Sequence, residues 1–322
     1  MNKTIVVVGA GISGLLLARD LRARGAEVVV LEKSRGVGGR LATKRVGPAV
    51  FDQGAQFFTV RDERFAAVVE GWRTQRLATA WPGGTGERVI GAAGMTAMPK
   101  ALAEGLDIQR EHRVTRAVRH ACGCWEIEIE NHGVIRAERL VLTAPVPQSL
   151  ALLAAGVLPP GLAESLARLT YHPCLALLCV LDGPSAVPVE GIAPSSGSIR
   201  WIADNTRKGI SLGAPAALTV HTTPAFAAEH YARGVEEVAA LLAAELAPWL
   251  GGSGLVSTTL HRWKFSEPRA THPEPYVWLP ELSLGFCGDA FGGPRVEGAA
   301  VSGLALASCM ATTLKAATFA ES

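Results

Sequence analysis

The strongest constraint on the fold is a set of three glycines at the point where a predicted strand meets a predicted helix. They are Gly9, Gly11 and Gly14. The β-branched run at 4–8 predicts a buried strand, and apolar residues at helical spacing predict a helix over 12–24, which Gly25 ends. The sequence EVVVL at 27–31 predicts a second strand. Both strands are apolar enough to be buried on both faces, which is typical of a parallel sheet covered by helices.

The spacing G-x-G-x-x-G gives this strand–helix junction a specific chemistry. The first glycine permits a tight turn, the second lets the backbone approach a pyrophosphate, and the third lets the helix pack on the sheet. The free N–H groups at the helix start, next to Ser13, favour that anion. Glu32 ends the second strand, where a carboxylate accepts hydrogen bonds from ribose hydroxyls, and Lys33 follows it. We expect these residues to bind a dinucleotide; a glycine-rich turn without a ligand is the alternative.

Length and composition limit the other possibilities. The chain has 322 residues, which suggests two domains at roughly 100–200 residues each. Hydrophobic residues make up 48% and charged residues 19%, which excludes a disordered or coiled-coil chain. The formal net charge of +2 is too small for a surface that coats nucleic acid or for a polybasic membrane tether. We therefore expect no nucleic-acid partner and no membrane partner, and the sequence carries no signal for an oligomeric state.

The apolar runs and the cysteines bear on compartment and metal binding. The longest uncharged runs, 4–18 and 298–312, are shorter than the ~20 residues that cross a bilayer. Two glycines interrupt the first run, which argues against an export signal. Six cysteines are too sparse for a disulfide scaffold, and no second pair at zinc spacing accompanies Cys122 and Cys124. We expect a cytoplasmic protein with reduced thiols and no metal site.

Two further segments favour FAD over NAD(P) as the bound dinucleotide. An acid-x5-G-G-R pattern begins at Glu32 and resembles the FAD-binding signature of the amine-oxidase-like flavoprotein superfamily. A Gly-Asp pair at 288–289, followed by an apolar helix, resembles the second FAD signature of that superfamily; an ordinary glycine-capped helix is the alternative. The resemblance implies FAD, with contacts from Gly39, Arg40, Val114, Asp289, Val296 and Ala299 in addition to the first glycine motif.

Within that superfamily the chain resembles renalases over most of its length. The segments that carry the resemblance are 52–58, 199–208, 220–223 and 261–265. It implies an FAD-dependent oxidase of isomeric dihydronicotinamide dinucleotides, which carry the extra hydride at the 2 or 6 position of the ring. The implied partners are a small dinucleotide substrate and O2, and the implied products are NAD(P)+ and hydrogen peroxide. The family was earlier linked to catecholamine oxidation.

The resemblance also implies residues on the substrate side. We expect Trp263 and His221 to be catalytic, the indole stacking on the nicotinamide ring and the imidazole orienting its carboxamide; a core tryptophan and a sheet histidine are the alternatives. Contacts with the substrate are expected from Arg200, Trp201, Asp204, Asn205 and Phe58. Asp-Asn pairs are also common in turns, so a structural role is the alternative for that segment. Gln56 is expected to line the flavin or, like Phe58, to belong to an apolar strand.

The implied reaction needs no general base, and the sequence shows no recognisable set of general-base residues. Hydride transfer from a dihydropyridine removes no acidic proton, so it needs orientation more than a general base. No Ser/His/Asp set and no paired-carboxylate signature is recognisable. The covalent-flavin cysteine segment of some monoamine oxidases is not recognisable either, so we expect non-covalent FAD.

Two other functions stay open. The chain could be an amine oxidase or a desaturase of the same superfamily, or a non-catalytic FAD- or nucleotide-binding module. Three tyrosines leave few candidates for an aromatic amine cage. Lys264 follows Trp263, so strand alternation directs it to the opposite face, as a surface lysine.

The predicted fold class is α/β, with a FAD-binding Rossmann-like domain and an inserted mixed α/β substrate domain, as in amine oxidases and p-hydroxybenzoate hydroxylase. The FAD-binding domain is expected to comprise 1–78, 94–165 and 283–322, with an excursion to the substrate domain at 79–93 and the insertion itself at 166–282. Active sites of two-domain proteins usually lie between the domains. We therefore expect the flavin to face a pocket lined by 199–205, 220–223 and 261–265.

Overall fold

The computed structural model describes residues 4–83 and 88–320 and is built around a six-stranded sheet. Five neighbouring strands run parallel, and the edge strand β16 is antiparallel to β17. In sheet order the strands are β16 (Val277–Leu279), β17 (Leu284–Phe286), β11 (Arg139–Leu142), β1 (Ile5–Val8), β2 (Val28–Glu32) and β7 (Asp107–Arg110). The first strand–helix–strand unit is confirmed within one residue, because its apolar runs are buried between two layers.

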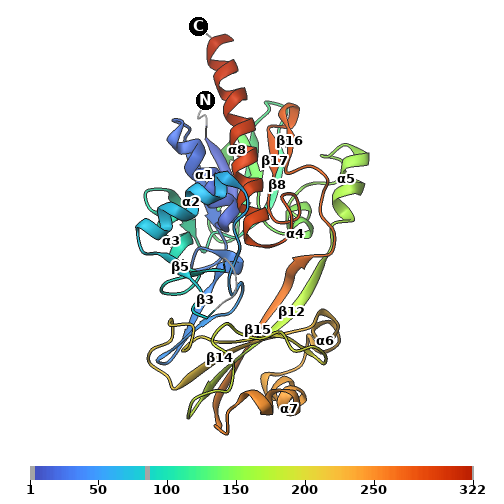
Figure 1. Ribbon diagram of the computed structural model, residues 1–322. Helices are drawn as coiled ribbons and strands as arrows, with labels where there is room; N and C mark the ends of the chain where they lie inside the picture. The colour runs from blue at the N-terminus through green and yellow to red at the C-terminus, as the bar shows by residue number, and fades with distance from the viewer. Residues whose placement is uncertain (1–3, 84–87, 321–322) are drawn as a thin grey trace.

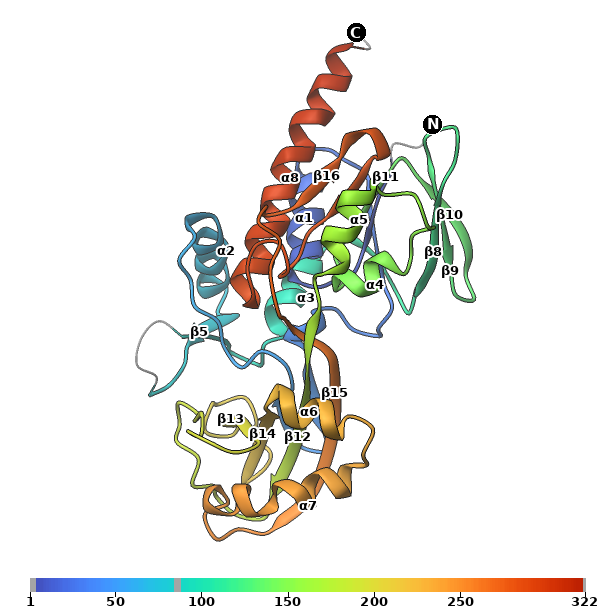
Figure 2. The same ribbon diagram turned by 90° about the vertical axis from the view of Figure 1, so that its right-hand side faces the viewer.

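Helices cover one face of this sheet, and a small meander with two short helices covers the other (Figures 1 and 2). The first layer holds α1 (Ile12–Ala23), α2 (Glu63–Thr74), α3 (Ala97–Ala103) and α8 (Arg295–Ala320). The second layer holds β8 (Val114–Arg119), β9 (Trp125–Ile129), β10 (Gly133–Ala137), α4 (Val146–Leu150) and α5 (Pro160–Ala167). α1 and α8 touch closely: a Cβ on Gly303 would lie 2.3 Å from the carbonyl oxygen of Ser13.

The inserted domain is a four-stranded antiparallel sheet with two helices on one face. Its strands are β13 (Ile199–Asp204), β14 (Ala216–Thr222), β12 (Tyr171–Leu181) and β15 (Leu255–Pro268), and its helices are α6 (Pro224–His230) and α7 (Val235–Leu246). Alternation along β12 sends Leu175 and Leu177 toward Val238 of α7, whereas Leu178 packs against Phe51 on the other side. That other face is therefore the one turned toward the first domain.

A β-hairpin of the first domain reaches this inner face of the inserted sheet. It consists of β3 (Thr43–Val46) and β4 (Ala49–Asp52), and Ala49 and Phe51 pack against Leu178 and Ala217. The two domains are also joined by β12 and β15, which pair from Tyr171 to Leu181 and run from one domain to the other (Figure 1).

The structure refines the expected boundaries. The inserted sheet ends at Pro268, and β16 at 277–279 already belongs to the six-stranded sheet, before the expected boundary at 282. Within the expected excursion at 79–93, β5 (Ala78–Ala80) pairs with β6 (Val89–Gly91), and residues 84–87 lie outside the described residues. A 3-10 turn, η2 (Ala247–Trp249), follows directly on α7. In the part of the chain that the structure describes, no helix has the length and apolarity to cross a bilayer.

Candidate functional site

A cavity of about 2700 Å³ extends from the first glycine motif to the inner face of the inserted sheet. Both glycine motifs, the start of α8 and the strands β13, β14 and β15 contribute to its wall. Ligand pockets for drug-sized molecules usually measure roughly 300–1,000 Å³, so this cavity has room for a dinucleotide and a second molecule.

The start of α1 fits a pyrophosphate. Gly11 is the N-cap, the helix has no side-chain cap, and no acidic residue occupies its first turn, so its N–H groups are free for an anion. A Cβ on Gly11 would meet nothing within 4 Å, so its backbone borders open space. Gly9 has φ +112° and lies against Thr143, and Ser13 donates to Cys287 Sγ at 3.2 Å. Gly14 does not line the cavity; its Cβ would lie 2.2 Å from the Gly9 carbonyl, so it serves packing.

The end of β2 fits an adenosine. Glu32 is 7% exposed, and its carboxylate accepts backbone N–H groups from Ala10 and Ser34, both at 2.8 Å. These bonds fix the carboxylate at the cavity wall and leave lone pairs for ribose hydroxyls. Val114 lines the same end of the cavity, whereas the ammonium of Lys33 bonds to Gln148 at 3.2 Å.

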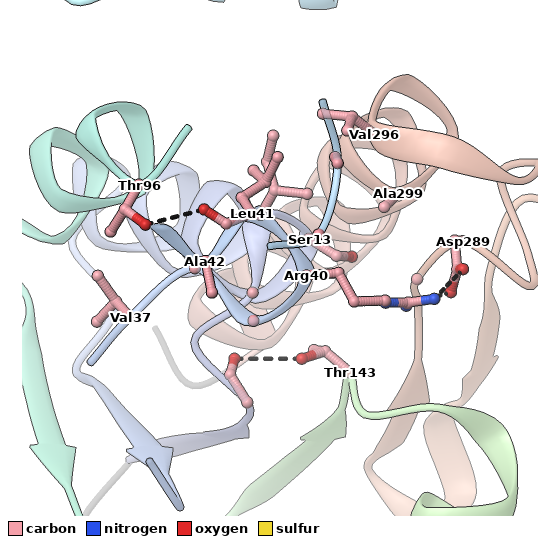
Figure 3. A pocket seen from close by; sticks show the side chains of 18 of the residues that line it. Ser13, Val37, Arg40, Leu41, Ala42, Thr96, Thr143, Asp289, Val296 and Ala299 are labelled. Carbon is pink, nitrogen blue, oxygen red and sulfur yellow. Dashed lines mark hydrogen bonds and ion pairs between the residues drawn. The ribbon is translucent and has the colours of Figure 1, made fainter. Parts of the chain in front are cut away.

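Arg40 and Asp289 lie together in the middle of the cavity (Figure 3). The guanidinium donates to both carboxylate oxygens, at 2.5 and 2.7 Å, and also to the carbonyl of Ser266 at 3.0 Å. The sequence analysis named both residues as FAD contacts, one in each signature, without a bond between them. The pair therefore joins the two FAD signatures, which are 249 residues apart in the chain.

The start of α8 also borders the cavity. Val296 and Ala299 lie on this helix beside Asp289 (Figure 3). Gly298 approaches the carbonyl of Gly293 so closely that a Cβ there would lie 1.9 Å from it, which requires glycine. The positive end of a 26-residue helix is thereby placed at the cavity wall, where it stabilises negative charge.

Trp263 and His221 bind the same backbone oxygen at the boundary between the domains. The indole Nε1 of Trp263 donates to the carbonyl of Gln53 at 2.9 Å, and Nε2 of His221 lies 3.1 Å from that oxygen. A carbonyl only accepts, so Nε2 of His221 carries the hydrogen. Burial lowers the pKa of His221 to about 4, so the imidazole is neutral near pH 7. His261 packs edge-on against Trp263 with ring centroids 4.2 Å apart.

A buried ion pair lies behind this wall. Lys208 Nζ lies 2.6 Å from Asp52 Oδ2 and 2.6 Å from the carbonyl oxygen of Gln56, and both charged side chains are fully buried. The other carboxylate oxygen of Asp52 accepts from Thr43 and from the backbone of Met95. The sequence marked Lys208 only as part of a resembling segment, and nothing local to it signals burial.

The structure corrects the expectation for Asp204 and Asn205, which do not line the cavity. Asp204 accepts from the Ser185 hydroxyl at 2.6 Å, and Asn205 Nδ2 donates to Ala217 and to Thr219, both at 2.9 Å. The other carboxylate oxygen of Asp204 accepts from the backbone N–H groups of Thr206 and Arg207 and so closes the turn after β13, which is the structural alternative considered for this segment.

The other candidate residues line the cavity, but several of them also bond to or pack against other residues of the protein. Arg200 does so while it pairs with Glu267 at 2.7 Å. Trp201 lines it and packs against Phe57, with ring centroids 5.6 Å apart. Phe58 contributes to the wall but is 4% exposed and packs in the core beneath α2. Gln56 lines the cavity as expected for a residue near the flavin.

The cysteines near the cavity are buried thiols with raised pKa values. The thiol of Cys287 accepts from Ser13, does not line the cavity, and has a pKa raised to about 12 by burial. Cys174 lines the cavity, and burial raises the pKa of its thiol to about 11. Over residues 4–83 and 88–320, no group of three or more His, Cys, Asp or Glu side chains is arranged to hold a metal ion.

The comparison with protein families decides between the dinucleotides. A family model described as flavin-containing amine oxidoreductase matches residues 82–311, and one described as an NAD(P)-binding Rossmann-like domain matches residues 7–71. The chain belongs to the flavin-containing amine oxidoreductase family. Its cofactor is FAD, and the glycine cradle, Glu32 and the free helix start fit that group.

Solved structures share the fold over nearly the whole chain. A protein from Exiguobacterium sp. 255-15, provisionally named protoporphyrinogen oxidase, superposes with a TM-score of 0.76 at 14% identity over 97% of this chain and 99% of its own. Cyclohexylamine oxidase from Brevibacterium oxydans gives a TM-score of 0.69 at 14% identity over 98% and 100%.

Curated relatives match over short segments only. Putrescine oxidase from Kocuria rosea is 40% identical over 70 residues, which is 22% of this chain and 15% of that protein. Hydroxyneurosporene desaturase from Rubrivivax gelatinosus is 44% identical over 66 residues, which is 20% of this chain and 13% of that protein.

Proposed function

We propose that this chain is an oxidase of isomeric dihydronicotinamide dinucleotides, the 2- and 6-dihydro forms of NAD(P), which it converts to NAD(P)+ with O2 as the electron acceptor and hydrogen peroxide as the second product. FAD, when bound, supplies a ring that accepts a hydride and gives two electrons to O2. The resemblance of segments 52–58, 199–208, 220–223 and 261–265 to renalases supports this substrate class.

The observation that carries the proposal is the charge of the cavity wall opposite the glycine motifs. Five charged residues border it from β3, β13 and β15: Arg45, Arg200, Arg262, Lys264 and Glu267. Arg200 pairs with Glu267, the Arg262 guanidinium donates to the carbonyls of Tyr231 and Arg233, and strand alternation turns Lys264 to the opposite face. Among the described residues, Arg45 is therefore the basic residue of this wall whose charge no ion pair takes up. An anionic dinucleotide is attracted to such a wall, whereas a protonated amine is repelled. The charge balance therefore favours a substrate that carries phosphates.

The groups nearest this wall orient a ring rather than move a proton. The indole of Trp263 is fixed through its N–H to Gln53, which leaves its face for stacking. His221 is neutral, and its Nε2 hydrogen is committed to the same carbonyl, so its other ring nitrogen is left as an acceptor. Hydride donation from a dihydropyridine requires orientation and no base, which agrees with this arrangement.

Oxidation of an amine is the second candidate function, because the short match to putrescine oxidase favours it. One feature of the cavity disfavours it. Tyr171, Tyr231 and Tyr276 are absent from the residues that line the cavity, so no tyrosine cage for an amine is formed there.

The test is anaerobic mixing of the purified FAD-loaded protein with isomerised NADH, ordinary NADH or putrescine, with flavin absorbance followed by stopped flow. Bleaching by the isomerised preparation and not by ordinary NADH is the expected result, and readmission of O2 should then yield hydrogen peroxide. Bleaching by putrescine instead would replace the proposal with amine oxidation. A firmly bound flavin that none of the three reduces would point to a non-catalytic FAD-binding module.

A further inference from the structure

Two of the cysteines lie together at the surface, in the turn between β8 and β9. Cys122 is exposed and Cys124 is partly exposed. Three other cysteines are buried, and burial raises the pKa of Cys174 to about 11 and that of Cys179 and Cys287 to about 12. A small reagent in solvent therefore reaches the thiols of the turn, whereas the three buried thiols are shielded from it.

A tight turn brings Cys122 and Cys124 close to each other. The N–H of Gly123 donates to the carbonyl of His120, and the N–H of His120 donates to the carbonyl of Cys124, both at 2.9 Å. Gly123 has φ +85°, a left-handed conformation that bends the chain between the two cysteines. Cα atoms two residues apart are at most about 7 Å from each other, and a bend shortens that distance into the range that a disulfide spans.

The side chain of Arg119 holds this turn in place. Its guanidinium donates to the carbonyl of Gly123 at 2.8 Å and to the carbonyls of Leu282 and Glu281 at 2.6 and 2.8 Å. The last two residues belong to η3 (Pro280–Leu282), between the strands β16 and β17. The two thiols are thus presented on a fixed turn of the β8–β10 meander, which lies away from the inserted domain (Figure 2).

The two thiols are not equivalent. Hydrogen bonding from the thiol and the backbone N–H of Cys124 lowers the pKa of Cys122, and the positive charge of Arg136 adds a smaller lowering. The same side-chain interaction raises the pKa of Cys124. The thiolate is the nucleophilic form of cysteine, so Cys122 is the nucleophile of the pair. Cysteines that respond to oxidants share these properties: an accessible thiol with a low pKa and a second thiol beside it.

We propose that Cys122 and Cys124 form a peroxide-reactive dithiol that closes a disulfide across Gly123. The thiolate of Cys122 attacks one oxygen of hydrogen peroxide, the O–O bond breaks, and the second oxygen leaves as hydroxide, which takes up the proton that Cys122 released. The thiol of Cys124 then attacks the sulfenic sulfur, and the S–S bond forms as water leaves. In sum, two thiols are oxidised to one disulfide and one hydrogen peroxide is reduced to two waters.

The proposed function supplies the oxidant, since hydrogen peroxide is its second product. The dithiol itself requires peroxide and not the dinucleotide substrate, so the inference goes beyond the proposed function and is tested separately from it. The turn lies at the opposite end of β8 from Val114, which lines the cavity. Peroxide therefore reaches the thiols through solvent, and their oxidation needs no access to the cavity.

The first experiment treats the FAD-loaded wild-type protein with hydrogen peroxide, blocks free thiols with iodoacetamide and maps tryptic peptides by mass. Cleavage after Arg119 and Arg136 gives one peptide, 120–136, that holds both thiols and no other cysteine. We expect this peptide to lose two hydrogens and to carry no alkyl group, and dithiothreitol to restore two alkylatable thiols. Two alkyl groups after peroxide treatment, or a sulfinic acid without a disulfide, would overturn the inference.

Variants then assign the two roles. Cys124→Ser should stop at the sulfenic acid of Cys122, which dimedone traps, and Cys122→Ser should react with peroxide at least about 10-fold more slowly than Cys124→Ser, because the more acidic thiol is gone. Cys309→Ser is the matched control, since Cys309 is also partly exposed but lies in α8, and it should keep the wild-type rate of disulfide formation. Equal rates in the Cys122 and Cys124 variants would overturn the assignment of the nucleophile.

A second experiment separates this inference from the proposed function. The same peptide is mapped after turnover with isomerised NADH and O2, with and without catalase, and we expect the disulfide only where catalase is absent. Failure of added peroxide to form the disulfide overturns the inference and leaves the proposed function intact. Bleaching of the flavin by an amine and not by isomerised NADH overturns the proposed function, and a disulfide formed by added peroxide would still support the dithiol.

Discussion

The ammonium of Lys208 lies 2.6 Å from a carboxylate oxygen of Asp52, and neither side chain is exposed to solvent. The lysine comes from the loop between β13 and β14 of the inserted domain, and the aspartate ends β4 of the FAD-binding domain. The pair therefore fastens one domain to the other directly behind the cavity turn 53–56.

Loss of Lys208 should destabilise the protein strongly. Lys208→Met leaves the carboxylate of Asp52 buried without its counter-ion, and such a loss costs about 3–5 kcal/mol. The double variant Lys208→Met/Asp52→Asn should recover part of that loss, because the amide is neutral and keeps the acceptor for Thr43 and Met95. Urea denaturation of the apoproteins measures both. A cost below about 1 kcal/mol for the single variant would contradict the importance of this pair.

Two glycines of one motif should fail in different ways when changed to alanine. A Cβ on Gly14 would lie 2.2 Å from a backbone oxygen, so Gly14→Ala should destabilise the apoprotein. A Cβ on Gly11 meets open space in the protein and φ is −76°, so Gly11→Ala should fold normally and bind FAD at least about 10-fold more weakly, because the methyl group borders the pyrophosphate position. Urea midpoints and FAD titrations distinguish the two. Equal losses of stability would show that our distinction between the two glycines is wrong.

The basic charge of the cavity wall should lower the KM for an anionic substrate. Arg45 is exposed and lines the cavity from β3, so Arg45→Gln should raise the KM for isomerised NADH a few-fold with little change in the maximal rate of flavin reduction. Added salt should raise the wild-type KM and affect the variant less. Arg73→Gln, on the exposed side of α2, is the control with the same charge change. An unchanged KM in the Arg45 variant would count against the assignment of this wall to phosphates.

His221 should make stability depend on pH in acid. Its pKa is about 4 in the folded protein and 6.5 ordinarily, so the unfolded chain binds the proton first as the pH falls. The contribution of neutral His221 to the free energy of unfolding is complete above about pH 6.5 and is lost progressively as the pH falls toward 4. His221→Gln, which keeps a donor for the carbonyl of Gln53, should show a smaller fall in urea midpoint between pH 7.5 and 5 than the wild type. A His221 variant that keeps the wild-type slope would refute the assignment.

Local patterns predicted the parts of the fold that depend on near neighbours in the chain. The β-branched run at 5–8, the glycine that starts α1 and the position of Glu32 follow from strand, turn and helix chemistry within about 30 residues. The antiparallel pairing of β9 with β10 depends on near neighbours in the same way, since the two strands are joined by a tight turn.

Residues whose partners lie far away in the chain were not predicted. Lys208 resembles a surface lysine in a polar loop, because its partner Asp52 is 156 residues away. Asp204 and Asn205 were expected to meet the substrate, yet Asp204 bonds to Ser185, and Asn205 bonds to Thr219 and accepts from the backbone N–H of Asp52 in the other domain. A turn motif does not indicate which side of a sheet it faces. The return of β16 to the first sheet depends on pairing with β17, which three apolar residues at 277–279 do not reveal by themselves.

The pairing of β12 with β15 has a mechanical consequence. The chain enters and leaves the inserted domain along these two adjacent strands, which share a ladder from Tyr171 to Leu181 (Figure 2). A force that pulls the two domains apart along the strands would act on β12 and β15 together. This two-stranded ribbon therefore resists stretching more than it resists bending. Bending is opposed in turn by the buried Lys208–Asp52 pair and by the packing of the β3–β4 hairpin on the inserted sheet, so the width of the cavity is held on both sides.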